Sequence, residues 1–160
     1  PRRHRVRHLR SRGQRPMSEE ARRMNTVKKI RVRDIMLTKP VMFTSDTDLL
    51  DAVCVLVNRR ISGAPVVDER GNLTGLLTER DFLKAALVAG YHGERGGRVG
   101  DYMSRDVQAV NADDSLLDVA TRFIETKRRR FPVIEDNRVV GVVVRRDVLR
   151  SVIETLKLRG

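Results

Sequence analysis

Two segments of this sequence follow the same order of residues, and this internal repeat restricts the fold more than any other feature. The pattern Val-x-Asp-x-Met at 32–36 recurs at 99–103, a shift of 67 residues. One residue is then lost in a polar turn, and a shift of 66 relates three further pairs: Gly75 and Gly141, Arg80 and Arg146, Asp81 and Asp147. Such a register predicts two copies of one structural unit.

Each copy is predicted to run strand, helix, strand, strand, helix, which is a mixed α/β (α+β) composition. The expected ranges are 41–44, 49–59, 64–67, 73–77 and 79–88, then 107–111, 115–126, 131–134, 139–144 and 146–158. The helix at 49–59 carries apolar residues on two faces, and a helix of that kind needs two packing partners. One partner can be its own sheet, and the other a helix of the sister copy or of a second chain, so a homodimer is expected.

Charge and composition divide the chain further. Residues 1–24 hold nine arginines and two glutamates, and therefore contribute seven of the twelve net positive charges. This stretch lacks aromatic residues and is expected to be a disordered basic tail. It is followed by the first repeat at 25–88, a Gly-rich linker at 89–98 and the second repeat at 99–158.

Several classes of protein are disfavoured. No run of apolar residues approaches a membrane span, and no secretory signal is evident, so a cytoplasmic protein is expected. The single Cys54 lies in an apolar stripe of a predicted helix and is expected to be a packing residue rather than a reactive thiol. No metal is assigned to His4, His8 or His92. The motifs of nucleotide hydrolases, zinc enzymes and serine hydrolases are absent, and the chain is predicted not to be an enzyme.

Four segments carry a resemblance to a known family: VRDIM at 32–36, SGAPVVDERGNLTGLLTERD at 62–81, VGDYM at 99–103 and RFPVIEDNRVVGVVVRRD at 130–147. Each repeat resembles a cystathionine-β-synthase-type (CBS) domain. The pair is similar to the Bateman module, in which two such domains dock about a pseudo-twofold axis. The resemblance implies a cleft between the repeats that holds adenosine-containing ligands: AMP, ADP, ATP or S-adenosylmethionine.

The resemblance also implies site residues. The family motif is complete at 75–81, where the Thr78 hydroxyl and backbone N–H groups of a helix start can donate to phosphate and the Asp81 carboxylate can accept from ribose. The alternative is that Thr78 only caps that helix. Related proteins place the walls of the base pocket at positions that correspond to Met42, Thr44, Ile61, Ser62 and Pro65, with Pro132 as the counterpart of Pro65 in the second repeat.

The second repeat departs from the motif. Val144 stands where the hydroxyl residue is expected, although Asp147 can still hold a ribose. Arg129 and Arg130 occupy positions from which basic residues of related modules reach the phosphates, and the arginine fork suits that role. The alternative for the basic run at 127–130 is a solvated cationic helix end.

The sequence therefore predicts a regulatory module that requires no cofactor, binds an adenine nucleotide or S-adenosylmethionine as a regulatory ligand, and signals to an unknown partner chain. No membrane partner is expected. Two alternatives remain open: a nucleic-acid-associated protein that uses the basic tail, which is disfavoured, and a dimerisation scaffold that binds no ligand.

Overall fold

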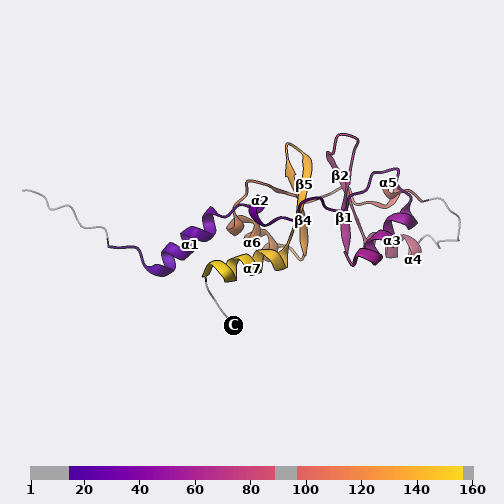
Figure 1. Ribbon diagram of the computed structural model, residues 1–160. Coiled ribbons are helices and arrows are strands. Elements are labelled where there is room, and N and C mark those ends of the chain that lie inside the picture. Colours follow the sequence, from indigo (N-terminus) through magenta and orange to yellow (C-terminus); the bar gives the residue numbers. More distant parts are fainter. Residues whose placement is uncertain (1–14, 89–96, 157–160) are drawn as a thin grey trace, which may run out of the picture.

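The computed structural model describes residues 15–88 and 97–156, and within them each repeat builds its own small sheet (Figure 1). In chain order the elements are α1 (Glu19–Lys29), α2 (Val32–Ile35), α3 (Leu49–Arg59), β1 (Gly63–Val67), β2 (Leu73–Thr78), α4 (Glu79–Val88), α5 (Val99–Tyr102), β3 (Val110–Asn111), α6 (Leu116–Glu125), β4 (Arg130–Glu135), β5 (Arg138–Val144) and α7 (Arg145–Leu156). The periodicity of the sequence predicted α3 and α4 with their observed bounds, both ends of α6 to within one residue, and the start of α7 to within one residue.

Two antiparallel hairpins, β1–β2 and β4–β5, form the sheets, and β3 joins the second sheet parallel to β4. The strand predicted at 41–44 contributes a single parallel bridge, between Phe43 and Val66. Pairing stops there because the Thr44 N–H donates to the Thr47 hydroxyl, 3.1 Å away, rather than to a neighbouring strand. The combination of helices with small, mainly antiparallel sheets confirms the predicted α+β class.

Each of the two hydrophobic cores contains residues from both repeats. α2 places Val32 in the core of the second repeat, beside Phe131. α5 places Val99 in the core of the first repeat, beside Leu49. Figure 1 shows this exchange, with α2 next to α6 and α5 next to α3. Each repeat thus contributes the short helix at its start to the other core, so separation of the repeats would expose both cores to water.

Gly75 and Gly141 lie where these exchanged segments cross the sheets. A Cβ atom on Gly141 would lie 2.7 Å from the Leu37 carbonyl oxygen and 2.8 Å from Met36 Sδ. A Cβ atom on Gly75 would lie 2.6 Å from Met103 Sδ. The two glycines therefore recur in the sequence for a structural reason, because any side chain there would displace the segment that crosses the sheet.

The aspartates of the repeated Val-x-Asp-x-Met pattern also have a structural role. Asp34 accepts a hydrogen bond of 2.9 Å from the Arg31 N–H, and Asp101 accepts one of 3.3 Å from the Arg98 N–H. Each carboxylate closes the first turn of a short helix that is otherwise too short to be stable alone.

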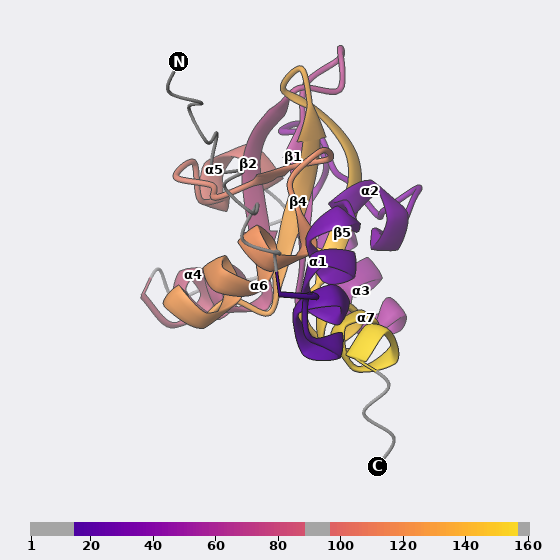
Figure 2. The same ribbon diagram turned by 90° about the vertical axis from the view of Figure 1, so that its left-hand side faces the viewer.

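The repeats are related by a pseudo-twofold axis. Under the repeat shift their isolated bridges form equivalent pairs: Leu37–Val142 with Ser104–Leu76, and Arg31–Ser115 with Arg98–Asp48. Asn72 and Arg138 are themselves equivalent positions and bridge each other, so they lie at the axis. Figure 2 shows the two hairpins side by side there. The predicted arrangement of two like halves is confirmed.

The prediction of a disordered tail is wrong for its last residues. α1 begins at Glu19, and the Ser18 hydroxyl caps it by accepting from the Ala21 N–H at 3.2 Å. Val27 of α1 is fully buried in the second core, and Arg23 reaches the Leu156 carbonyl oxygen. Composition could not indicate this helix, since its stability comes from packing on α6 and α7 rather than from its own apolar content.

Two further predictions concern single positions and the chain outside the described ranges. Cys54 is exposed on α3, so within the single chain it does not have the packing role that was predicted for it. Residues 1–14, most of the predicted linker, the last residues of the final predicted helix and all three histidines lie outside the described residues. At the end of the linker, Gly97 is buried and accepts from the Leu49 N–H at 2.8 Å.

A reciprocal pair of hydrogen bonds starts α4. The Asp81 N–H donates to the Thr78 hydroxyl at 3.1 Å, and the Thr78 N–H donates to the Asp81 carboxylate at 3.0 Å. This is a capping box, which satisfies backbone donors that the first helical turn leaves free. In the second repeat Val144 replaces the hydroxyl residue, so α7 starts without that side-chain acceptor.

We expect Gly141→Ala to lower the free energy of unfolding by about 1–3 kcal/mol, because the new methyl group meets a backbone carbonyl that cannot move aside. Urea denaturation measures the change. Leu37→Ala is the matched control, since it alters a 53% exposed side chain of the same crossing segment and leaves its backbone intact. Equal free energies of unfolding of the two variants would show that a methyl group at position 141 fits without displacing the crossing segment.

We expect Thr78→Ala to lower the free energy of unfolding by about 1 kcal/mol through loss of the cap, whereas Thr78→Ser keeps the hydroxyl and most of the stability. Thermal and urea unfolding of both variants without ligand test this. An unfolding curve of Thr78→Ala that overlies that of the native chain would contradict a capping role.

Candidate ligand site at the seam between the repeats

Two cavities lie where the two repeats contact each other, here called the seam, and Arg130 lines both. The first, here called the seam cavity, has a volume of about 300 Å³ and is lined by Leu37, Thr38, Lys39, Pro40, Val41, Arg59, Ile61, Gly63, Pro65, Arg130 and Val142. The second, here called the arginine cavity, has a volume of about 470 Å³ and is lined by Arg60, Ser62, Arg129, Arg130, Val144, Arg145 and Arg146. Together they form a recess with one mainly apolar end and one cationic end.

Arg130 reaches from the start of β4 across the seam. Its Nη1 atom donates to the Gly63 carbonyl oxygen at 3.1 Å, and its buried Nε atom has no hydrogen-bond partner among the described residues. Burial lowers the pKa of this guanidinium, and the nearby Glu79 offsets part of that effect. Gly63 and Arg130 are equivalent positions of the two repeats, so the axis brings a bulky cation against a residue that has no side chain. An unused buried donor favours a ligand that accepts hydrogen bonds.

The seam cavity has the character of a slot for a flat apolar ring. Ile61 and Pro65 of the first repeat face Val142 of the second, with Pro40 and Val41 beside them. One side of the seam cavity is formed by residues 37–40, the segment that crosses the second sheet, where Leu37 pairs with Val142. The slot therefore exists only because the two repeats exchange these segments.

The arginine cavity carries five guanidinium groups and no carboxylate among its lining residues. Arg60 ends α3 in the left-handed conformation, with φ of 55°. Arg145 and Arg146 occupy the first turn of α7, and the Arg145 N–H donates to the Arg129 carbonyl oxygen at 2.9 Å. A cluster of rigid guanidinium forks in a recess is suited to phosphate oxygens, which accept bidentate hydrogen bonds.

Five of the residues predicted from the sequence come together here. Ile61, Pro65 and Arg130 line the seam cavity, and Ser62 and Arg129 join Arg130 in the arginine cavity. Pro132 is buried in β4 opposite Val142, so it supports the wall of the slot from behind.

Three predicted residues lie elsewhere. Thr44 lines a separate recess of about 540 Å³ together with Asp68 and Arg70. Met42 is 40% exposed and lines none of these three cavities. Asp147 accepts from Arg150 at 3.2 Å. The predicted set thus mixed positions that the fold distributes over different surfaces.

Thr78 and Asp81 line neither the seam cavity nor the arginine cavity. They form the capping box of α4, and the Ser104 hydroxyl donates to the second oxygen of Asp81 at 3.2 Å. Ser104 belongs to the segment that crosses the first sheet, just as Leu37 crosses the second. Sequence reasoning therefore combined the motif of one half of the seam with base-pocket residues of the other half.

Arg60, Arg145 and Arg146 were not singled out from the sequence, although one signal was available. Acidic residues stabilise the first turn of a helix, and cations there oppose the helix dipole. α7 begins with two arginines, whereas α4 begins with Glu79. A local rule broken in this way often marks a functional position.

The described residues set two further limits. In the ranges 15–88 and 97–156, no three His, Cys, Asp or Glu side chains gather in a way that could hold a metal ion. None of the helices in that part of the chain combines the length and the apolar content needed to cross a membrane.

Comparison with known proteins gives relatives that are longer than this chain. The protein MJ1225 of Methanocaldococcus jannaschii is 30% identical over 119 residues, which are 74% of this chain and 41% of that protein. The A-adding tRNA nucleotidyltransferase of Aquifex aeolicus is 33% identical over 129 residues, 81% of this chain and 15% of the enzyme. The chain thus spans less than half the length of both relatives.

Solved structures agree with the fold. CBSX2 in complex with AMP is similar with a TM-score of 0.67 and 29% identity, covering 78% of this chain and 96% of that one. The CBS domain pair of MJ0100, in complex with 5′-methylthioadenosine and S-adenosyl-L-methionine, is similar with a TM-score of 0.65 and 29% identity, covering 76% and 94% of the two chains.

The family model described as CBS domain matches residues 32–88 and again residues 99–154. Both matches begin at the short exchanged helices and include the hairpin and the helix that follows it. The chain therefore belongs to the CBS domain family and contains a pair of its domains.

Proposed function

We propose that this chain is a regulatory module that binds an adenosine-containing ligand at the seam and passes its binding state to another chain. The observation that carries the proposal is the junction of the apolar slot with the arginine cavity at Arg130. A purine is flat and largely apolar on its faces, and a phosphate is a multiple acceptor, so the recess presents each part with a suitable surface.

Two similar structures support this choice of ligand class. CBSX2 binds AMP, and the MJ0100 domain pair binds 5′-methylthioadenosine and S-adenosyl-L-methionine. In this chain we assign the base to Ile61, Pro65 and Val142, and the phosphate to Ser62, Arg129 and Arg130. The residues that line the two cavities include no histidine, cysteine or carboxylate to act as a general base, which supports binding rather than chemistry.

Thr78 and Asp81 have a different place in this proposal. In the free protein the Thr78 N–H and the Ser104 hydroxyl each donate to one oxygen of the Asp81 carboxylate, and each oxygen keeps a second acceptor position. We therefore assign these two residues to the start of α4 in the free protein.

The surface that would carry the signal is apolar and occurs on both repeats. Equivalent positions expose the same kind of side chain: Val57 and Ile124 at 61% and 85%, Leu83 and Leu149 at 58% each, and Leu87 and Ile153 at 84% and 38%. A surface repeated about a twofold axis is suited to a second copy of the chain, because a dimer axis can match the repeats of one copy with those of the other.

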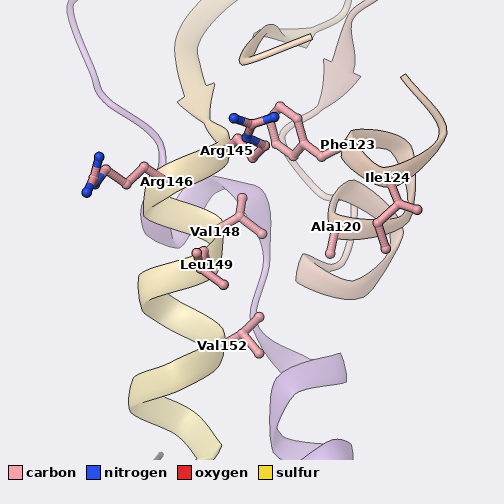
Figure 3. Close-up of a pocket in the computed structure, with 8 residues that line it drawn as sticks. All are labelled: Ala120, Phe123, Ile124, Arg145, Arg146, Val148, Leu149 and Val152. Atoms are coloured by element: carbon pink, nitrogen blue, oxygen red, sulfur yellow. The ribbon is translucent and has the colours of Figure 1, made fainter. Parts of the chain in front are cut away.

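A groove connects this surface with the site. The helix groove, about 560 Å³ between α6 and α7, is lined by Ala120, Phe123, Ile124, Arg145, Arg146, Val148, Leu149 and Val152 (Figure 3). Arg145 and Arg146 line both the helix groove and the arginine cavity. A ligand that draws these side chains toward itself would alter the mouth of the groove, which couples the site to the dimer surface.

We expect calorimetric titration of the full chain with AMP, ATP and S-adenosylmethionine to detect binding of at least one of them. Arg130→Met should weaken that binding about tenfold, because it removes charged hydrogen bonds while keeping an apolar stem. Arg138→Met is the matched control, since Arg138 is exposed and lines neither cavity. Absence of heat with all three ligands at millimolar concentration would refute the proposal.

We expect the native chain to sediment as a dimer and Leu149→Glu to shift it toward the monomer, because a carboxylate would be buried unpaired in the apolar interface. Light scattering after size exclusion measures the mass. Met42→Glu, which changes a 40% exposed apolar residue outside this surface, should remain dimeric. A monomeric native chain would exclude the second copy as the partner.

A further inference from the structure

The arginines of the arginine cavity are not neutralised by carboxylates, unlike other arginines at the contacts between the repeats. Other arginines at the repeat contacts are neutralised: Arg33 pairs with Asp113 and Glu135 at 2.8 Å, and Arg98 pairs with Asp46 at 3.0 Å. None of the five arginines of the cavity forms a salt bridge with a described residue. Like charges gathered in a recess repel one another, so they favour an anionic ligand.

The positive charge is also greater in one half of the seam than in the other. Under the repeat shift, Arg129, Arg130 and Arg145 of the second repeat correspond to Ser62, Gly63 and Glu79 of the first. Arg60 corresponds to Lys127 and Ser62 to Arg129, so the equivalent recess would have two guanidinium groups, one ammonium group and one carboxylate in place of five guanidinium groups. A pseudo-symmetric fold thus presents an asymmetric potential, with one strongly cationic pocket per chain.

The shape of the recess gives the direction in which a ligand lies. The slot of about 300 Å³ ends at Arg130, and the arginine cavity of about 470 Å³ begins there. The cationic part is larger than the apolar part. The start of α7 adds Arg145 and Arg146 to the same cavity, where the Arg129 carbonyl oxygen accepts from the Arg145 N–H. A single phosphate therefore leaves some of the five guanidinium groups unpaired.

The two arginines at the start of α7 need a counter-charge. Their guanidinium groups add to the positive end of the helix dipole, and Asp147, the acidic residue of the same turn, pairs with Arg150 instead. Phosphate groups beside this turn would meet the helix N–H groups and both side chains at once, and would supply that counter-charge.

From these contacts we propose that the ligand of this site is a nucleoside polyphosphate, bound once per chain, whose terminal phosphates are held by Arg60, Arg145 and Arg146. The inference rests on the proposed function and selects among its ligands. It disfavours S-adenosylmethionine, because a sulfonium cation would lie among five guanidinium groups. It also ranks ATP above ADP and ADP above AMP, since each added phosphate reaches more of the cavity.

Calorimetric titration of the full chain with ATP, ADP, AMP, S-adenosylmethionine and inorganic tripolyphosphate tests the ranking. We expect ATP to bind at least about tenfold more tightly than AMP, with a stoichiometry near one per chain. The double variant Arg145→Gln/Arg146→Gln should remove most of that preference while AMP affinity changes little. Arg80→Gln, the counterpart of Arg146 in the first repeat, is the matched control and should keep the ATP preference. Thermal unfolding without ligand checks that each variant is folded.

The outcomes separate the two levels of the proposal. Affinity for AMP or S-adenosylmethionine equal to or above that for ATP would overturn the polyphosphate assignment and leave the proposed function standing. Binding of tripolyphosphate without any adenosine ligand would uphold the arginine site and refute the proposed function. A double variant that keeps the full ATP preference would remove Arg145 and Arg146 from the site. No binding of any compound would refute both.

Discussion

The close crossing of an extended segment over a glycine, made once in each repeat, is the contact on which the rest of the structure depends. Leu37 crosses β5 at Gly141, and Met103 lies against Gly75 on β2. These crossings place α2 and α5 in the core of the opposite repeat. Because each core is completed by the other repeat, the relative position of the two hairpins is fixed by apolar burial rather than by a surface contact alone.

The seam follows from that arrangement. With the hairpins held about the axis, equivalent positions face each other, and a bulky residue can only be accommodated where its counterpart is small. Arg130 opposite Gly63 is such a pair, and the guanidinium spans the seam to the Gly63 carbonyl. The same pair joins the apolar slot to the arginine cavity. Asymmetry of sequence within a symmetric backbone thus makes one half of the seam more cationic than the other, where Thr78 and Asp81 form the capping box of α4.

Much of the secondary structure could be predicted, because the signals that define it lie within a few residues of one another. α3 and α4 have the predicted bounds because apolar spacing and a polar start define a helix without reference to the rest of the chain. α1 was missed because its stability depends on Val27 reaching a core that, apart from Val32, is formed by buried residues more than eighty positions away. Among the predicted site residues, Ile61, Pro65 and Arg130 converge on the seam cavity, whereas Thr78 and Asp81 line neither cavity and form the capping box of α4. A repeat pattern cannot tell which half of one copy faces which half of the other.

The sequence by itself determined that there are two like units, where their helices and hairpins lie, and that basic residues precede the fourth strand. Only the tertiary structure decided that the first short helix of each unit packs in the other unit, and that Arg60, Arg145 and Arg146 share one recess with Arg129 and Arg130. The physical reason is range. Helix and turn preferences act over a few residues, whereas the crossings and the cationic recess arise from burial of surfaces that are distant in the chain and become neighbours only when both cores close.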